Sequence, residues 1–560
     1  MKRFVIAIFV LILALAAGAN AQTSRFTVED LLKVRRVSDP QVSPDGRNVV
    51  YVVGDVNLEA NRVVNQIYVM PLTGGSAKQL TSGATSASSP RWAPDGKQIA
   101  FVTGGQIWVM DSDGDDKKQI TKISTGAAAN VWSPDGNWIA FTSEVYPDCT
   151  DDDCNKRKDE AAEKSKVTAH ITERLLYRHW NEWRDLKRTH VFVVSSKGGT
   201  ARELTPGDFD SPPYAASSNV DFSFSPDGKE LAFVKNPDKV EAISTNSDIY
   251  VVSLTGGAAK NITSRNRGYD ATPVYTKDGR SILYRSQATA GFEADRWRLM
   301  KYDRASGVST EIVRGFDQQV DEFVLSPDGD SIYFVAGERG HHPIFKVSAG
   351  GGRATKILDD VFATNLNITS DGRFLVFAHS SLAAPPEIYR ANISSGDFGP
   401  ITSINRELLA RANLPAGEEM EWTGALGTKI HGFLVKPADF DAGKKYPLVV
   451  LIHGGPQGAW NDSWSYRWNP QVFANNGYIV FSPNPRGSTG YGQKFVNDIS
   501  GDWAGKVYVD LMNGVAEVVR RNKFIDRNRI GAAGASYGGY MINWIEGHNN
   551  DPRAHFKVLV

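Results

Sequence analysis

Cysteine is nearly absent from this chain of 560 residues, which contains only Cys149 and Cys154. Two thiols without nearby histidines make a poor metal site, and in an oxidising compartment a local disulfide is the expected outcome. Net charge is also lacking, because Lys+Arg and Asp+Glu both number 63. This balance gives no sign of a nucleic-acid partner or of a polybasic contact with membranes.

Long hydrophobic runs are missing as well. The apolar run from Phe4 to Ala17 has 14 residues, fewer than the roughly 20 that a transmembrane helix needs. It follows Lys2 and Arg3 and precedes the cleavage pattern Ala19-Asn20-Ala21, which together are typical of a secretory signal peptide. We therefore expect residues 1–21 to be removed, and the mature protein to be periplasmic or secreted without a membrane span.

One short turn motif, Ser-Pro-Asp-Gly, recurs through the first four hundred residues. Clear copies lie at 43–46, 93–96, 133–136, 225–228 and 326–329, and the copy at 93–96 begins with alanine. Two degenerate copies lie at 276–279 and 369–372. Each precedes a short strand pattern, and a second strand–turn–strand pattern alternates with it. The period is 40 to 51 residues apart from one gap of 92. Such a repeat predicts a seven-bladed β-propeller over residues 22–404.

The gap of 92 residues between Asp135 and Asp227 has two interpretations. It has room for an eighth blade, but only one strand–turn–strand pattern falls within it, at 191–205. We favour an insertion in blade three at about 144–190, which would contain both cysteines. Its charged run at 155–166 predicts a solvated helix, and its aromatic end is expected to pack on another surface.

The character of the chain changes near Asn405. Apolar runs at 446–452 and 477–481 suit strands that are buried on both faces of a parallel sheet. The segment 510–522 has helical periodicity. Strands that alternate with helices predict a doubly wound α/β domain over residues 405–560.

The strongest functional signal is Gly534-Ala535-Ser536-Tyr537-Gly538, between a strand pattern and a helix pattern. The form Gly-x-Ser-x-Gly in that context is typical of an α/β-hydrolase nucleophile, here Ser536; otherwise it is a Gly-rich turn with a spare serine. His453-Gly454-Gly455-Pro456 follows the first apolar strand. We expect the backbone N–H groups of Gly455 and Tyr537 to form an oxyanion hole, and His453 to be structural, because the base follows the serine in this fold.

These motifs resemble the prolyl oligopeptidase family of serine peptidases, which combines a seven-bladed propeller with an α/β-hydrolase domain. The resemblance is carried by 534–540, 453–456, Asn484 to Gly492 and Gly501-Asp502-Trp503. It is strongest to the dipeptidyl-peptidase V and acylaminoacyl-peptidase branch, and Leu176 to Trp180 points to the first of these.

The resemblance implies a peptidase that acts on short peptides, releases dipeptides from a free amino terminus and needs no cofactor or metal. Glu182 or Asp185 would bind the substrate amine. Alternatives are an acylaminoacyl-peptidase, a broader oligopeptidase, an esterase or a non-catalytic propeller that binds partners. Whether the protein forms a homodimer is left open.

A catalytic base and its orienting acid are hard to find after Ser536. The candidates His548, Asp551 and His555 lie toward the far end of the following helix or before the next strand, whereas the site belongs at the carboxyl ends of the strands. We therefore expect that the chain is a fragment and that roughly 100 or more further residues carry the acid and the base.

Overall fold

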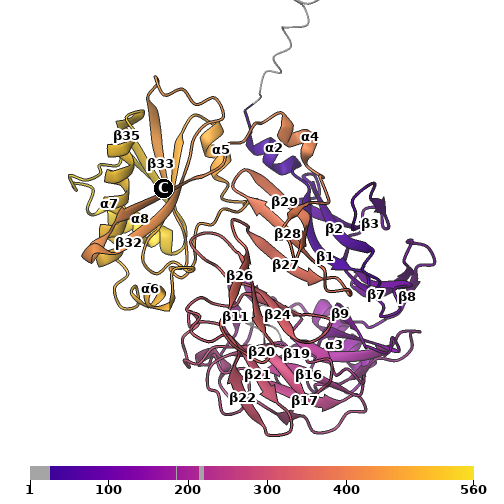
Figure 1. Cartoon of the computed structure of the whole chain (residues 1–560). Coiled ribbons are helices and arrows are strands. Elements are labelled where there is room, and N and C mark those ends of the chain that lie inside the picture. The colour runs from indigo at the N-terminus through magenta and orange to yellow at the C-terminus, as the bar shows by residue number, and fades with distance from the viewer. Residues whose placement is uncertain (1–24, 174, 185, 214–219) are drawn as a thin grey trace, which may run out of the picture.

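The computed structural model describes residues 25–173, 175–184, 186–213 and 220–560. The predicted signal peptide lies outside the described residues. Figure 1 shows a β-propeller from the indigo to the orange part of the chain, beside a domain of mixed helices and strands in orange and yellow. The combination predicted from the repeat and from the strand–helix alternation is confirmed.

The propeller consists of seven four-stranded antiparallel sheets in the described chain. Blade by blade, the strands are β1 (Arg36–Val42), β2 (Asn48–Asn57), β3 (Arg62–Pro71) and β4 (Lys78–Gln79); β5 (Ala87–Trp92), β6 (Gln98–Thr103), β7 (Gln106–Asp111) and β8 (Lys118–Gln119); β9 (Ala128–Trp132), β10 (Trp138–Val145), β13 (Arg188–Ser195) and β14 (Arg202–Glu203); β15 (Phe222–Phe224), β16 (Glu230–Lys235), β17 (Asp248–Ser253) and β18 (Lys260–Asn261); β19 (Asp270–Tyr275), β20 (Ser281–Ser286), β21 (Arg298–Asp303) and β22 (Val308–Glu311); β23 (Glu322–Leu325), β24 (Ser331–Val335), β25 (Ile344–Ser348) and β26 (Thr355–Leu358); and β27 (Ala363–Ile368), β28 (Phe374–Ser381), β29 (Ala384–Asn392) and β30 (Phe398–Pro400).

The recurring turn joins the first two strands of each blade, and its hydrogen bonds explain its sequence. In blade three, Ser133 Oγ donates to Asp135 Oδ1 at 2.6 Å and accepts from Trp138 N at 2.9 Å. The same aspartate oxygen accepts from Asn137 N at 3.0 Å. Serine and aspartate therefore close the turn through side chains, while Gly136 adopts a φ of 71°, which costs glycine little.

Apolar side chains fill the spaces between neighbouring blades. The first and last blades also share a buried cluster, in which Tyr51 and Met70 pack with Val376 and Ile388. Asn367 Nδ2 donates to the carbonyl oxygen of Pro40 at 2.9 Å across the same junction. Packing and hydrogen bonding thus close the ring, since each blade takes its four strands from one continuous stretch of chain.

The insertion in blade three begins after β10 and ends before β13. These strands pair as far as Val145 and Arg188, so the predicted boundaries at 144 and 190 fall inside paired strands. The insertion contains helix α3 (Asp152–Lys164), which covers most of the charged run, and the short strands β11 (Arg178–His179) and β12 (Glu182–Trp183).

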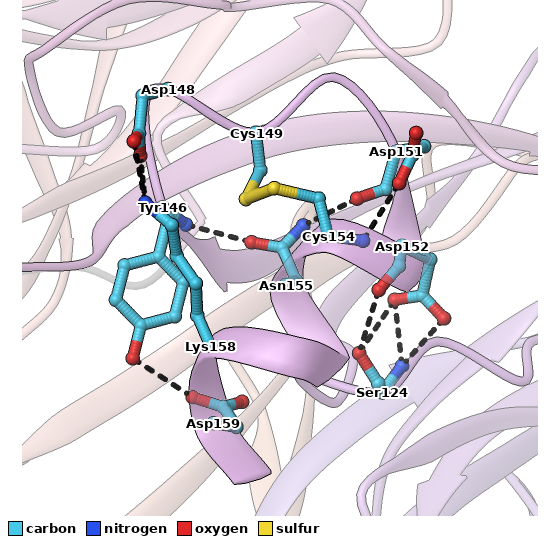
Figure 2. Close-up of a disulfide and its surroundings, with 10 residues drawn as sticks. All are labelled: Ser124, Tyr146, Asp148, Cys149, Asp151, Asp152, Cys154, Asn155, Lys158 and Asp159. Atoms are coloured by element: carbon cyan, nitrogen blue, oxygen red, sulfur yellow. Dashed lines mark hydrogen bonds and ion pairs between the residues drawn. A yellow bond between two sulfur atoms is a disulfide. The ribbon is translucent and has the colours of Figure 1, made fainter. Parts of the chain in front are cut away.

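A disulfide between Cys149 and Cys154 lies at the amino end of α3 (Figure 2). Asp151 caps the helix by accepting a hydrogen bond from Cys154 N at 2.7 Å. Asp152 accepts from Ser124 N at 2.9 Å. The disulfide and these bonds together hold the first turn of α3 against blades two and three.

Replacing both cysteines with serine is expected to lower the free energy of local unfolding of α3 by about 2 kcal/mol, the chain-entropy value for a loop of six residues. The effect should be local, because α3 lies outside the four strands of its blade. Hydrogen exchange should rise in α3 while exchange in the strands β10 and β13 stays unchanged. A loss of structure throughout the propeller would contradict this expectation.

The second domain contains one mixed sheet in the strand order β31-β32-β34-β33-β35-β36. The first pairings are antiparallel, and β34, β33, β35 and β36 run parallel to one another. The strands are β31 (Glu418–Thr423), β32 (Lys429–Val435), β33 (Tyr446–Ile452), β34 (Ile479–Asn484), β35 (Ile525–Gly534) and β36 (Val558–Leu559). In the propeller, the 3-10 turn η1 (Glu241–Ile243) connects β16 to β17 of blade four. The helices and the 3-10 turn outside the blades are α2 (Val28–Lys33), α4 (Arg406–Ala410), η2 (Ala425–Gly427), α5 (Pro470–Asn475), α6 (Gln493–Asn497), α7 (Gly505–Arg521) and α8 (Tyr537–Glu546).

Helices α7 and α8 pack against this sheet and bury its main core. Val507, Leu511, Val515 and Val518 of α7 join the apolar side chains of the strands there. Figure 1 shows both helices on the same side of the domain, away from α5. Among the described helices, none is both long enough and apolar enough to cross a membrane.

Candidate active site

Ser536 occupies the turn between β35 and α8. Its φ of 57° and ψ of −124° lie outside the regions that a serine normally prefers. The side chain is exposed, whereas the next residue, Tyr537, is buried and donates from its hydroxyl to the Trp503 carbonyl oxygen at 2.7 Å. A strained serine presented at the end of a central strand is the geometry expected for a nucleophile.

Two glycines permit this turn because the backbone passes too close for a side chain. A Cβ on Gly534 would lie 2.6 Å from the carbonyl carbon of Gly538. A Cβ on Gly538 would lie 2.2 Å from the carbonyl oxygen of Ile452 at the end of β33. The flanking glycines of the motif are therefore required by contact with the chain itself and with the neighbouring strand.

The candidate oxyanion hole lies beside this turn. The parallel register pairs Ile452 of β33 with Gly534 of β35, so the segment after β33 meets Ser536. A Cβ on Gly454 would lie 3.3 Å from Ser536 Cβ and 3.8 Å from its Oγ. Among the described residues, no acceptor bonds to the backbone N–H of Gly455 or of Tyr537. The role of these two amides in holding an oxyanion stays a prediction.

His453 is buried at the carboxyl end of β33. Its Nδ1 lies 2.7 Å from the carbonyl oxygen of Gly454, and its Nε2 lies 2.9 Å from Ser488 Oγ. Because a carbonyl oxygen only accepts, Nδ1 carries a proton toward Gly454. The Ser488 hydroxyl lies against Nε2 and also 2.6 Å from the Pro485 carbonyl oxygen, so its single proton is shared between these two acceptors. Burial lowers the pKa of His453, so the ring stays neutral and holds the turn in place.

The candidates for base and acid that follow Ser536 have other partners. His548 Nδ1 lies 2.7 Å from the Trp544 carbonyl oxygen, and His555 Nδ1 lies 2.7 Å from that of Asn549. Asp551 pairs with Arg553, which lowers the pKa of that carboxyl to about 2 against a small opposing effect of burial. None of the three bonds to Ser536 in the described chain. That the acid and base lie elsewhere stays a prediction.

A buried ion pair that sequence reasoning missed supports the loop after β34. Arg486 Nε and Nη2 donate to the two carboxylate oxygens of Asp510 at 2.8 and 3.0 Å. The side chains are 1% and 0% exposed. The same carboxylate accepts from Ala425 N at 2.8 Å, and Arg486 Nη2 donates to the Ala425 carbonyl oxygen at 2.8 Å. The available signal was an aspartate in a helix pattern of otherwise apolar core positions.

The carboxyl ends of the central strands face the propeller. The segment after β33 contacts it through Asp462 N, which donates to the Gly340 carbonyl oxygen at 2.7 Å. The segment after β34 contacts it through Gln493 Nε2, which donates to the Ala294 carbonyl oxygen at 2.9 Å. Ser536 belongs to the same end of the sheet, so the propeller covers the side from which a substrate would approach.

Among the described residues, Glu182, which is predicted to bind the substrate amine, has no hydrogen bond or ion pair to Ser536. Glu182 is exposed on β12 and lies opposite His179 in the strand register of the insertion hairpin. Asp185 lies outside the described residues. Within the part of the chain that the structure describes, no three His, Cys, Asp or Glu side chains gather in a way that could hold a metal ion.

Comparison with known proteins supports both halves of the fold. A family model for the prolyl oligopeptidase family matches residues 464–560, and one for the TolB β-propeller domain matches residues 35–220. The chain is 34% identical to dipeptidyl-peptidase 5 of Porphyromonas gingivalis over 562 aligned positions, which cover 97% of this chain and 79% of that protein. It is 33% identical to dipeptidyl-peptidase 5 of Porphyromonas endodontalis, covering 95% of this chain and 77% of that protein.

Solved structures share the arrangement of the two domains. The acylaminoacyl peptidase of Pyrococcus horikoshii superposes with a TM-score of 0.75 at 22% identity, covering 93% of this chain and 76% of that one. A puromycin-hydrolysing peptidase of Mycobacterium tuberculosis superposes with a TM-score of 0.66 at 17% identity, covering 94% and 78%. At these identities the likeness shows the fold.

Proposed function

Because this chain belongs to the prolyl oligopeptidase family and is a serine peptidase that acts on peptides, we propose that it releases dipeptides from the free amino terminus of short peptides. The observation that carries the proposal is the strained, exposed Ser536 at the sheet end that faces the propeller. The names of the two similar Porphyromonas proteins support the dipeptidyl specificity. The propeller over the site favours short peptides over folded proteins.

In the proposed reaction, Ser536 Oγ attacks the carbonyl carbon of the second residue of the peptide. Its proton passes to a base and from there to the departing amine, while the N–H groups of Gly455 and Tyr537 stabilise the negative oxygen. Water then cleaves the acyl-enzyme and frees the dipeptide.

Comparison of two substrates on the purified protein tests this specificity. We expect kcat/KM for a dipeptidyl p-nitroanilide to exceed that for the same compound with an acetylated amine by on the order of 100-fold, the scale of a lost charged interaction. The two compounds share the scissile bond, so the difference reports on recognition of the free amine.

Equal rates on both compounds would favour a broader oligopeptidase, and a preference for the acetylated compound would favour an acylaminoacyl-peptidase. Glu182 is the described candidate partner for the amine. Glu182→Gln should raise KM only for the compound with a free amine, and an unchanged KM would remove Glu182 from that role.

A further inference from the structure

The loop between β34 and α6, residues 485–492, is held by both domains. On its propeller side, Arg339 N donates to the Gly490 carbonyl oxygen at 2.9 Å, and Gly492 N donates to Gln318 Oε1 at 3.2 Å. On its catalytic side, Ser488 bonds to His453, which precedes the predicted oxyanion turn. A change in the contacts between the propeller and this loop would therefore also shift the residues around Ser536, through the contact between Ser488 and His453.

Tyr491, within this loop, ends a chain of hydrogen bonds that begins on the propeller. His341 Nε2 lies 2.9 Å from Glu419 Oε1, and Glu419 Oε2 lies 3.2 Å from His431 Nε2. His431 Nδ1 lies 2.7 Å from the Tyr491 hydroxyl, which accepts from Asn484 Nδ2 at 3.0 Å. His431 is 2% exposed, so bulk water does not replace these partners readily.

The chemistry of the partners fixes the direction of each bond in the neutral state. A carboxylate only accepts, so Nε2 of His341 and Nε2 of His431 both donate to Glu419. Nδ1 of His431 is then the acceptor for the Tyr491 hydroxyl proton. Asn484 Nδ2 donates to the Tyr491 hydroxyl oxygen, which donates its own proton to His431 Nδ1. Both nitrogen atoms of His431 and the Tyr491 hydroxyl therefore have complementary hydrogen-bond partners only when His431 is neutral.

We propose that His431 is a positioning residue that couples propeller docking to the loop beside Ser536, and that protonation of His431 releases this coupling. A proton on Nδ1 would turn the atom that accepts from Tyr491 into a donor. The hydroxyl proton of Tyr491 would then lose its acceptor in a buried site, which is unfavourable. The inference rests on the proposed role of Ser536 for its catalytic meaning, and on the contacts alone for the coupling.

Burial, acting against the nearby carboxylates, sets the sign of the pH effect at His431. The imidazole faces Glu419 and Glu421, Arg339 reaches across from the propeller to pair with Glu421, and Lys429 lies on the same strand. Burial is the largest effect and lowers the pKa of His431 below 6.5. The docked state therefore resists protonation, and it loses stability as the pH falls below 6.5 toward that lowered pKa.

Glu419 remains a fixed anion over this range. Burial acts to raise its pKa, but the hydrogen bond from His341 and the two histidine charges outweigh burial and lower it below 4.5. The contribution of Glu419 to the stability of the docked state is fully present above pH 4.5. It is lost only as the pH falls through the lowered pKa of Glu419. An effect just below pH 6.5 thus points to a histidine, and a His431 variant is needed to separate His431 from His453, whose pKa is also lowered by burial and which bonds to Ser488 of the same loop.

Hydrogen exchange at the amides of Arg339 and Gly492 reports on the coupling, because both amides donate across the domain contact. After correction for intrinsic rates, their exchange should accelerate by roughly threefold or more between about pH 7.5 and about pH 5.5. In His431→Gln, whose amide does not titrate, this acceleration should disappear. Full acceleration in that variant, or none in the unaltered protein, would overturn the proposal.

Tyr491→Phe provides a second variant that keeps the ring and removes only the hydroxyl. It should raise exchange at Arg339 and Gly492 already at about pH 7.5 and reduce the further change on acidification. His555→Gln, in an exposed segment, is the matched histidine control and should behave like the unaltered protein. A pH response in Tyr491→Phe as large as in the unaltered protein would also overturn the proposal.

A kinetic measurement separates this inference from the proposed function. With a dipeptidyl p-nitroanilide, His431→Gln should shift the acid limb of kcat/KM to lower pH, a change that a purely structural role would not produce. If no peptidase activity is found but the exchange results hold, the proposed function fails and the coupling stands. If activity is present with an unshifted acid limb, the catalytic part of the inference is wrong.

Discussion

Ser536→Ala is expected to lower kcat/KM for a dipeptidyl substrate by about 10⁴- to 10⁶-fold, the range for loss of a serine nucleophile. The variant keeps the backbone of the turn but removes the only atom that can form the acyl-enzyme. KM should change little, because no described hydrogen bond of the Ser536 side chain holds the surrounding loops. Steady-state release of p-nitroaniline by the purified protein over a range of substrate concentrations measures both quantities.

Covalent labelling provides the control for this result. A fluorophosphonate should label the unaltered protein at Ser536 and should leave Ser536→Ala unlabelled. Ser395→Ala, in an exposed turn of the last blade, is the matched replacement and should keep full labelling and activity. Residual activity within tenfold of the unaltered protein would mean that another residue is the nucleophile. Unfolding temperatures within a degree or so would exclude loss of fold as the cause.

The propeller was predictable because its turns carry their own stabilisation. Ser133 and Asp135 form hydrogen bonds to each other and to the backbone of the same turn. The motif can therefore be recognised from the local sequence without knowledge of the neighbouring blades. The core of the hydrolase domain was also predictable, because strands such as β33 are buried on both faces and therefore have continuous apolar sequences. Family membership and the peptidase activity followed from those local patterns.

The contacts between blades could not be predicted in the same way. Asp221 Oδ1 accepts from Thr272 N of the next blade at 2.6 Å, and Glu322 Oε2 accepts from Leu366 N at 3.1 Å. Both acids precede the aspartate of their own turn by six residues. Burial raises the pKa of Asp221 to about 6 and that of Glu322 to about 7. Their partners lie far along the chain, so the sequence shows only isolated acids.

The same limit applies to the candidate site. The serine turn and the His453 segment were found because each depends on glycines within a few residues. Glu419, His431 and Tyr491 were not found, since their hydrogen bonds join a hairpin, a loop and the propeller. The pairing of β10 with β13 runs to Val145 and Arg188, within two residues of the approximate bounds predicted for the insertion.

Asp510→Asn is expected to lower the free energy of unfolding of the catalytic domain by about 3–5 kcal/mol, the scale for removing one partner of a buried ion pair. The substitution leaves the almost fully buried Arg486 without its closest acidic partner, so that it faces the more distant Asp498 carboxylate, 3.8 Å from Nη1. The two oxygens of the Asp510 carboxylate accept hydrogen bonds from the backbone N–H groups of Ala425 and Arg486. An asparagine side chain has only one accepting oxygen, so one of these two bonds would be lost. Urea unfolding followed by the fluorescence of buried Trp422, which packs beside α7, measures the loss.

Asp526→Asn is the matched control, because Asp526 pairs with Arg529 in an exposed position and should change stability far less. If unpaired charge is the cause, the double replacement Arg486→Leu with Asp510→Leu should cost less than the sum of the two single replacements. Additive losses would show instead that the two residues act through separate contacts. Since Arg486 begins the loop that carries Ser488 and Tyr491, Asp510→Asn should also accelerate exchange at Gly492, at a pH where His431 is neutral.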